Sequence, residues 1–306
     1  MLGKENMATS VRRPDGEIVT TSQSLPGIYR GRLRKIPLLR GVIVLVQSLI
    51  TGIQALFHSA QIASDEEGEE EALSPALLWG TFAASVAFTV VVFFVAPLLI
   101  TRHVIDPHIQ SVLLSNVIEG LLRIGVFLIY LKLIGLMSDI RDVFACHGAE
   151  HKVVNAHEKG CSLEIEKIRD YSTAHARCGT SFLFAVLIIS ILVFALLGHQ
   201  VLWLSILSRV ILLPLVAAIS YEITQLAAKL ALPEESHGGS RSRKLTQKVL
   251  ASVLLSPGLM LQSLTTREPS DAQLEVALSA LNRVIEADKR CGEEKEATPG
   301  SGHPDS

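Results

Sequence analysis

Long stretches with few or no charged side chains are the feature that most restricts how this 306-residue chain can fold. Residues 76–100 and 181–198 contain no Asp, Glu, Lys or Arg. A helix of about 20 apolar residues is long enough to cross the hydrocarbon core of a bilayer. The sequence therefore predicts a mainly α-helical, polytopic membrane bundle with about four spans, at residues 76–100, 111–137, 181–198 and 202–228.

Residues 36–62 form another apolar segment, but polar side chains recur along it at helical intervals. These intervals place the polar groups on one face of a helix. A helix with such a stripe suits the membrane interface, or the inside of a bundle, better than a span surrounded by lipid. We therefore expect an interfacial or re-entrant helix over 36–62, with a polar face of Arg40, Gln47, Thr51, Gln54, His58 and Gln61.

Lysine and arginine are concentrated in three segments: residues 1–40 carry eight, residues 139–180 carry six and the residues after Ala228 carry ten. Short segments rich in these residues tend to stay in the cytoplasm. Four spans with both termini cytoplasmic place all three segments there, whereas a fifth span within 36–62 would move the last two outside. We expect a multi-pass protein of the inner (plasma) membrane that contacts the lipid bilayer. The net charge of −2 gives no sign of nucleic-acid binding.

The segments outside the spans differ in character. A Pro14-Asp15-Gly16 turn between two short β-prone runs predicts a small N-terminal β-hairpin within residues 1–35. Residues 139–180 form a cytoplasmic loop that contains the most reactive side chains. Residues 240–290 form an amphipathic segment, whose last helix should begin near Ser270 or Asp271, and residues 291–306 have the composition of a disordered tail.

The sharpest motif is His147-Gly148-Ala149-Glu150-His151, an H-x-x-E-H pattern that inverts the zincin motif. Residues four apart share one face of a helix, so both imidazoles can reach the same metal ion. Glu150 is then placed to take a proton from a metal-bound water. The alternative is a solvated helix that carries two exposed histidines.

A metal site needs a third ligand. Glu158 lies seven residues beyond His151, about 10 Å along a straight helix, and is too far to join both histidines. His175 and Cys178 just precede a span, and Glu222 lies near the cytoplasmic end of the last span. The three should reach the same membrane level as the motif, and such donors favour a divalent metal, above all zinc.

Each of these candidate ligands also has a structural interpretation. Cys178 would be an inert small residue, His175 would hydrogen-bond its own loop, and Glu222 would pair with Lys229 or Gln225 along its helix. A titratable group inside a span is nonetheless a functional candidate, because burying it in lipid is costly.

A second set of charged residues lies deeper in the predicted spans. Glu119 and Arg123 are four residues apart, in the order that favours an ion pair on one helix. Arg209 lies near the outer end of the last span, where we expect its long side chain to reach the interface. We interpret Glu119 and Arg123 as a structural pair, with a transport pathway as the alternative.

Four motifs occur in a fixed order: FxxHGAEHKVxNxxE, HxRCGTSF, ISYEITQL and PGLMLQSLTTREPSDAQLEVALSAL. Together they resemble the YqhQ-like family of bacterial membrane proteins, which are described as predicted metal-dependent enzymes. The resemblance implies that the family's motif positions are His147, Glu150, His151, Lys152, Asn155, Glu158, His175, Arg177, Cys178, Gly179 and Glu222. Cys146 and His157 depart from the family pattern, so we discount both as ligands.

The resemblance and the motif lead to three hypotheses. In the first, a metal-dependent hydrolase binds its ion through His147 and His151, and His175, Cys178 or Glu222 completes the site. Glu150 would be the general base, and Lys152 or Arg177 would hold an anionic substrate. The second is a non-catalytic membrane scaffold or assembly factor with a structural His/Cys/Glu cluster, and the third is a transporter. A second copy of the chain or another membrane protein would suit as partner, and the substrate is open.

Overall fold

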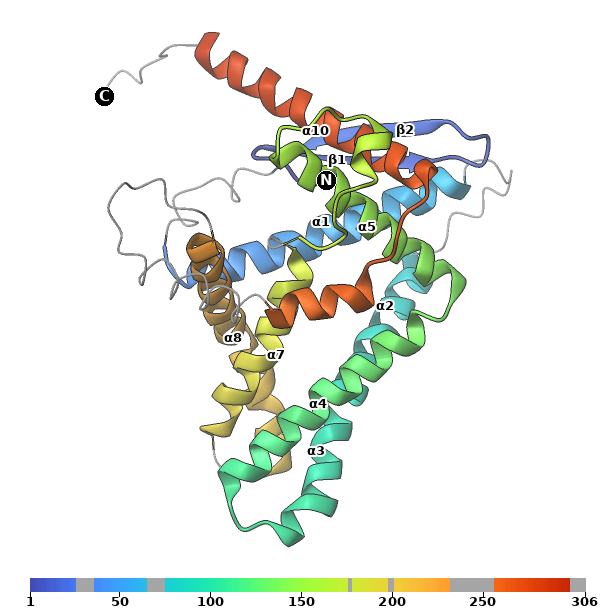
Figure 1. The fold of residues 1–306 in the computed structure, drawn as a ribbon. Coiled ribbons are helices and arrows are strands. Elements are labelled where there is room, and N and C mark those ends of the chain that lie inside the picture. The colour runs from blue at the N-terminus through green and yellow to red at the C-terminus, as the bar shows by residue number, and fades with distance from the viewer. Residues whose placement is uncertain (26–35, 65–74, 176–177, 198–200, 232–255, 298–306) are drawn as a thin grey trace, which may run out of the picture.

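The computed structural model describes residues 1–25, 36–64, 75–175, 178–197, 201–231 and 256–297 (Figure 1). Within these residues the chain is mainly helical, as predicted. The strands and helices are β1 Asn6–Arg12, β2 Ile18–Ser24, α1 Leu39–Ser64, α2 Pro75–Val90, α3 Ala96–Ile100, α4 Val112–Ile134, α5 Ser138–Glu158, α6 Ile165–Ile168, α7 Gly179–Ala195, α8 Leu202–Ala231 and α10 Asp271–Ala297. Residues 256–265 form a further helix, and π-helical turns at Val91–Val95 and Thr101–Ile105 flank α3.

The predicted N-terminal hairpin is confirmed. β1 and β2 pair antiparallel, with Arg12 opposite Ile18 at the closed end. Gly16 has a φ of +91°, a conformation that a glycine adopts without steric cost. The Asp15 carboxylate accepts a 2.7 Å hydrogen bond from the Glu17 amide, which closes the turn. The turn chemistry is thus local, and the sequence alone was enough to predict it.

Four helices of the described chain are long and apolar enough to cross a membrane: Leu39–Ser59, Trp79–His108, Val112–Ile134 and Trp203–Ala227. The predicted fold class with about four candidate spans is therefore confirmed, but the set differs from the predicted one, because it includes α1 and not α7. α7 is apolar but shorter, while α1 meets the length requirement. Figure 1 shows α1 running across the ends of α7 and α8 rather than alongside them. The interfacial placement of α1, and a crossing by α7, stay predictions.

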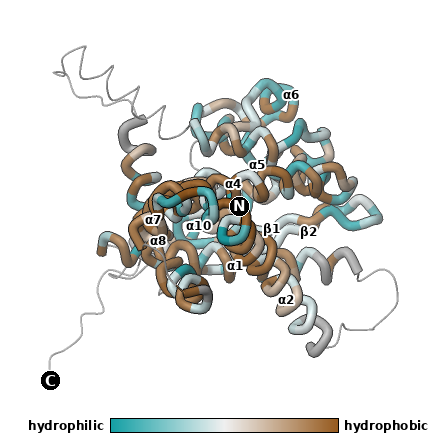
Figure 2. Tube along the Cα trace, turned by 90° about the horizontal axis from the view of Figure 1, so that it is seen from below, coloured by the Kyte–Doolittle hydropathy of each residue, from teal (hydrophilic) through white to brown (hydrophobic). Residues whose placement is uncertain are grey.

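A second layer lies at the end of these helices that is opposite the turn between α3 and α4 (Figure 1). It consists of the hairpin, α5, α6 and α10, and it has its own core of Ala8, Ala149, Val153, Ala156, Ile168, Leu274, Ala277, Leu281 and Val284. Figure 2 shows hydrophobic residues along α7, α8 and α1, and many hydrophilic residues around α6. The layer therefore has a hydrophobic core of its own beside the apolar bundle.

The start of α10 shows how this layer is held together locally. The Ser270 amide donates to Gln273 Oε1 at 2.9 Å, and the Gln273 amide donates back to the Ser270 hydroxyl at 3.4 Å. This reciprocal pair is a capping box, which satisfies amides that the first helical turn leaves unpaired.

The charged residues inside the apolar bundle form one buried cluster. Glu119 accepts hydrogen bonds from Arg123 at 2.5 Å and from Arg209 at 2.7 Å, and all three side chains are buried. Arg123 also donates to the Phe93 carbonyl at 3.0 Å, in the π-helical turn. The expectation that Arg209 reaches the interface is therefore wrong, because a buried carboxylate on α4 offers it a partner inside the bundle. The cluster joins α4 to α8 and, through the Phe93 carbonyl, to the π-helical turn between α2 and α3.

Candidate metal centre

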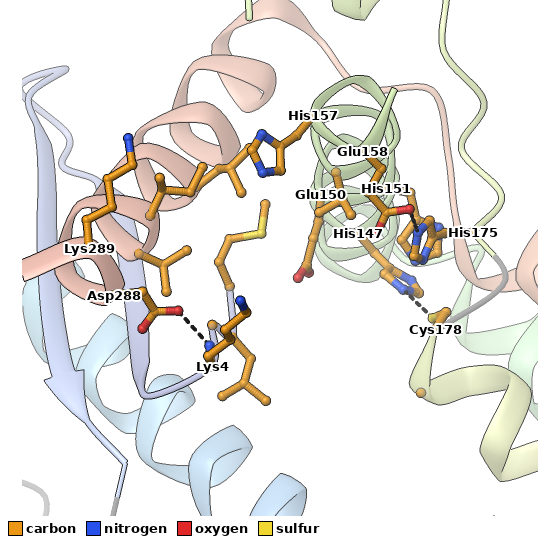
Figure 3. Close-up of a pocket in the computed structure, with 18 residues that line it drawn as sticks. Lys4, His147, Glu150, His151, His157, Glu158, His175, Cys178, Asp288 and Lys289 are labelled. Carbon is orange, nitrogen blue, oxygen red and sulfur yellow. Dashed lines mark hydrogen bonds and ion pairs between the residues drawn. The ribbon is translucent and has the colours of Figure 1, made fainter. Parts of the chain in front are cut away.

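α5 carries both histidines of the motif on one face. Their rings meet edge to face, with centroids 4.4 Å apart. The helix continues without interruption through the motif and ends at Glu158, and Gly160 follows with a φ of +67°. Glu150 lies beside His147 on the helix surface, since residues three apart are neighbours there. The motif therefore presents its two imidazoles toward Cys178, while the Glu150 carboxylate points toward α10 and the N-terminal residues (Figure 3).

Cys178 completes a group of three candidate ligands. It caps the start of α7, and its sulfur lies 3.2 Å from His147 Nε2. One ligand atom from each of His147, His151 and Cys178 lies within 4.8 Å of the other two. Around a tetrahedral zinc, nitrogen and sulfur donors lie roughly 3.5 Å apart. The three side chains are therefore close enough to become ligands of one ion.

Backbone carbonyls hold both histidine rings in a single orientation. His147 Nδ1 lies 2.9 Å from the Thr265 carbonyl oxygen, and His151 Nδ1 lies 2.5 Å from that of Thr173. A carbonyl only accepts, so Nδ1 donates in each ring and Nε2 is the nitrogen left for a metal ion. In the metal-free site His147 Nε2 donates to Cys178, and a metal ion would take the place of that proton. Metal-binding histidines are characteristically fixed in this way. The two rings are thus prepared to bind a metal through Nε2.

The helix at 256–265 supports the site from behind. The buried Gln262 side chain accepts from the His175 amide at 2.9 Å and donates to the His175 carbonyl at 2.8 Å. It also donates to the Ser181 hydroxyl in α7 at 3.0 Å. The same segment supplies the Thr265 carbonyl to His147. One short helix therefore positions the loop before α7 and a histidine of α5 together.

Gly148 explains why a glycine stands inside the motif. A Cβ at this position would lie 2.0 Å from the Arg267 carbonyl oxygen. The Arg267 amide donates to the Phe144 carbonyl at 2.9 Å, so the two backbones are in direct contact. Only glycine allows the segment that orients His147 to approach α5 this closely.

The environment of Cys178 favours the thiolate. Burial would raise the pKa of its thiol, but hydrogen bonds from His147, His151 and Thr180 outweigh burial and lower the pKa to about 5. Burial likewise opposes the charged form of His147, but its hydrogen bond to Cys178 prevails and raises the His147 pKa. A thiolate is the form of cysteine that binds metals. The site thus holds Cys178 in its metal-binding state.

A cavity of about 910 Å³ opens over these three residues, between α5 on one side and α10 with the N-terminal residues on the other (Figure 3). His147, His151 and Cys178 line it together with Glu150. In Figure 3 the Glu150 carboxylate points into this space. Leu281, Val284 and Ile285 of α10 line it as well. The volume is in the range of small-molecule sites.

Two other predicted residues, His175 and Lys152, differ in their position relative to the three candidate ligands. His175 lines the cavity, and its ring centroid is 5.8 Å from that of His151, but its Nε2 lies 3.3 Å from a Glu158 carboxylate oxygen. Lys152 is buried, donates to the Arg169 carbonyl at 2.6 Å and pairs with Glu268 at 2.7 Å. His175 is therefore adjacent to the three ligands, while Lys152 ties α5 to neighbouring segments.

Glu222 and Arg177 have different outcomes. Glu222 forms an ion pair with Arg40 at the start of α1 and accepts from the Leu38 amide at 3.1 Å. The structure does not bring it into the group with His147, and the predicted pairing with Lys229 lies outside the described side chains. Arg177 lies outside the described residues. Sequence reasoning missed Thr173, Gln262 and Thr265, because nothing in a sequence marks a carbonyl that will orient a distant ring.

Comparison with known proteins identifies relatives. A family model described as "Protein of unknown function (DUF1385)" matches residues 36–287. The chain is 31% identical over 303 residues to a protein of Bacillus subtilis (strain 168) named "Uncharacterized protein YqhQ", and the match covers 92% of this chain and 88% of that protein. No solved structure matches. The resemblance to YqhQ-like proteins is thereby confirmed, while neither description states a metal or a reaction.

Proposed function

The chain belongs to the DUF1385 family, and on this premise we propose that it is a membrane-bound, metal-dependent hydrolase. A zinc ion would be held by His147, His151 and Cys178. The observation that carries the proposal is the convergence of these donors with both Nδ1 atoms already bound to carbonyls. Three protein ligands beside an open cavity are typical of catalytic zinc sites, whereas structural sites use four.

The donor set also suits zinc in its chemistry. Imidazole and thiolate are ligands that zinc prefers, whereas magnesium and calcium prefer oxygen. Zinc, when bound, would supply a Lewis acid and lower the pKa of its water. Glu150 is the group on this chain that would accept the proton, because its carboxylate lies in the same cavity. The remaining walls would orient the substrate and limit access of bulk water.

We place the site on the cytoplasmic side, with both termini there. The three segments rich in lysine and arginine support this orientation. The site lies in the layer opposite the α3–α4 turn, and residues 101–110 contain Arg102 as their single Lys or Arg (Figure 1). An alkylation test of single-cysteine variants at either end of the bundle, in oriented vesicles, would measure the orientation directly.

Elemental analysis of the purified protein tests the metal. We expect about one zinc per chain, and we expect His147→Ala and Cys178→Ala to lose it. His157→Ala is the matched control, because His157 is an exposed histidine of α5 that lines the cavity outside the three-residue group. A wild-type protein that stays metal-free after incubation with zinc would refute the proposal. Equal metal content in His147→Ala and wild type would also refute it.

The position of His175 favours a second candidate, a non-catalytic scaffold with a structural zinc. Its ring centroid lies 5.8 Å from that of His151, so His175 is the nearest further imidazole that a fourth coordination position would draw on. X-ray absorption distinguishes the two functions. A zinc ion coordinated by one sulfur, two nitrogens and one oxygen supports the hydrolase. A zinc ion coordinated by one sulfur and three nitrogens supports the scaffold. The transporter hypothesis has less support, since Glu119 is already engaged by Arg123 and Arg209.

A further inference from the structure

The cavity over His147, His151 and Cys178, here called the metal group, adjoins a second cavity of about 470 Å³. Both are lined by Glu150 and by the first two residues of the chain, Met1 and Leu2. The second cavity runs from this shared wall toward α1, between β1 and α10. Glu150, the candidate proton acceptor, therefore lies where the two spaces meet.

α1 contributes a row of small residues to the second cavity: Ser48, Gly52, Ala55 and Ser59. Their spacing places them along one line of the helix. A Cβ added at Gly52 would meet no atom within 4 Å, so this part of the wall is open. The helix thus forms a smooth side of the cavity without large side chains to fill it.

The row of small residues lies at the edge of the exposed apolar face of α1. Leu49 and Leu56 directly follow two of its members and are 61% and 72% exposed, and Ile50 and Phe57 are exposed too. Gln47, 2% exposed, lies on the buried side of the helix, and Thr51, 9% exposed, lines the second cavity beside the row. Exposed apolar residues on this scale mark a surface that contacts a membrane or another protein. In the interfacial placement that we expect for α1, this face meets lipid, and the second cavity borders it.

The first cavity has charged residues on both walls, whereas Glu150 is the one charged side chain among the described residues that line the second cavity. His147, His151 and Glu150 lie at one end of the first cavity. Its other wall carries Leu281, Val284 and Ile285 but also the charged residues Lys4, Asp288 and Lys289 (Figure 3). The second cavity is lined by Met7, Ala8, Val276, Ala277 and Ala280, together with Gln273, Cys146 and small hydroxyl side chains. A ligand that fills both spaces thus needs a polar head and a long apolar part.

Resting on the proposed function, we propose that the substrate is a membrane lipid. Its polar head would lie at His147, His151, Cys178 and Glu150, and one acyl chain would extend past Met1 and Leu2 into the second cavity along α1. A small polar substrate would leave the apolar walls unused. A peptide would bring backbone amides into a space whose far walls, apart from Gln273, Cys146 and small hydroxyl groups, offer apolar side chains.

Alkyl hydroxamates of increasing length test this inference in the full-length, cobalt-substituted protein in lipid nanodiscs. The hydroxamate head binds metals, and the visible spectrum of cobalt reports binding directly. We expect affinity to rise from acetohydroxamate through octanohydroxamate to dodecanohydroxamate, by up to about fourfold for each methylene that enters an apolar site. Partition into the bilayer also depends on chain length, so variants of the cavity wall are required.

Gly52→Phe fills the second cavity from α1. We expect it to weaken dodecanohydroxamate at least tenfold and to leave acetohydroxamate within twofold of wild type. Gly80→Phe is the matched control, because Gly80 is an exposed glycine of α2 whose Cβ would also meet nothing within 4 Å. If Gly52→Phe does not fold, Ala55→Phe repeats the blockade at the next residue of the row.

The outcomes separate this inference from the proposed function. Failure to bind cobalt would overturn the metal site itself. Cobalt binding with acetohydroxamate, but with equal dodecanohydroxamate affinity in wild type and both cavity variants, would overturn the lipid substrate alone. A leucine-containing dipeptide hydroxamate that binds more tightly than the alkyl series, and that is insensitive to Gly52→Phe, would identify a peptide substrate instead and would also overturn the inference.

Discussion

Replacing Gly148 by alanine should destabilise the protein, although alanine is the better helix former. The new Cβ would lie 2.0 Å from the Arg267 carbonyl oxygen, whereas ordinary contacts begin at 3.4 Å. The backbone at Arg267 must therefore move away from α5 by about 1.4 Å, the difference between these two distances. A shift of this size breaks the 2.9 Å bond from the Arg267 amide to Phe144 and the 2.9 Å contact between His147 and Thr265.

The magnitude follows from these losses. Each hydrogen bond contributes about 1 kcal/mol net, and overpacking costs about 1–3 kcal/mol. The higher helix propensity of alanine offsets about 1 kcal/mol of this destabilisation. We expect a net loss of about 2–4 kcal/mol, which lowers the melting temperature by about 5–10 °C. Zinc affinity should also fall by about 10–100-fold, because His147 loses the bond that orients its ring.

Gly125→Ala is the matched control for Gly148→Ala. Gly125 also lies inside a helix, and a Cβ there would meet nothing within 4 Å. Helix propensity alone then predicts a gain of up to about 1 kcal/mol. Circular dichroism melting in detergent, followed by zinc analysis, compares the two variants. A Gly148→Ala protein that melts at or above wild type and binds zinc equally would refute the close approach of Arg267 to α5.

Three further predictions concern single side chains. In metal-free protein, alkylation of Cys178 by iodoacetamide should rise through a midpoint near pH 5, because its lowered pKa makes the thiolate dominant above that pH. Bound zinc should protect Cys178 from alkylation. A midpoint near the ordinary pKa of cysteine, about 8.5, would contradict this prediction. Glu119→Gln should lower stability by about 3–5 kcal/mol, because two buried guanidinium groups lose their counter-ion; thermal melting measures this, and adding Arg209→Met should restore part of the loss. Lys152→Met should lower the melting temperature while the protein keeps its zinc, since Lys152 binds the Arg169 carbonyl and Glu268 outside the metal group; loss of zinc would show a role in the site.

Much of the candidate site was predictable because it depends on local periodicity and on depth. The four-residue interval between His147 and His151 fixes their common face once α5 is helical. Cys178 stands directly before an apolar helix, so hydropathy places it at the membrane surface near α5. Periodicity and hydropathy together are therefore enough to bring these three candidate ligands to the same membrane level.

Periodicity and hydropathy could not decide which neighbouring residue a side chain faces. Hydropathy gives the depth of Glu222 along its helix, but it does not say which neighbour the carboxylate faces, and the structure pairs it with Arg40. Arg209 likewise turns inward because Glu119 of another helix lies within reach. His175 sits near the group, but Glu158 holds its ring nitrogen. In each case a residue distant in sequence is the deciding partner.

The sequence by itself determined the helical membrane class, the number of candidate spans, the hairpin and the spacing of the H-x-x-E-H motif. Each follows from interactions within a few residues or from the length of an apolar run. Only the tertiary structure decided which carbonyls orient the two imidazoles, which charged groups neutralise one another, and where the two cavities meet at Glu150. These features depend on how helices rotate and pack against each other, and that is settled by the sum of many contacts between segments that no local pattern encodes.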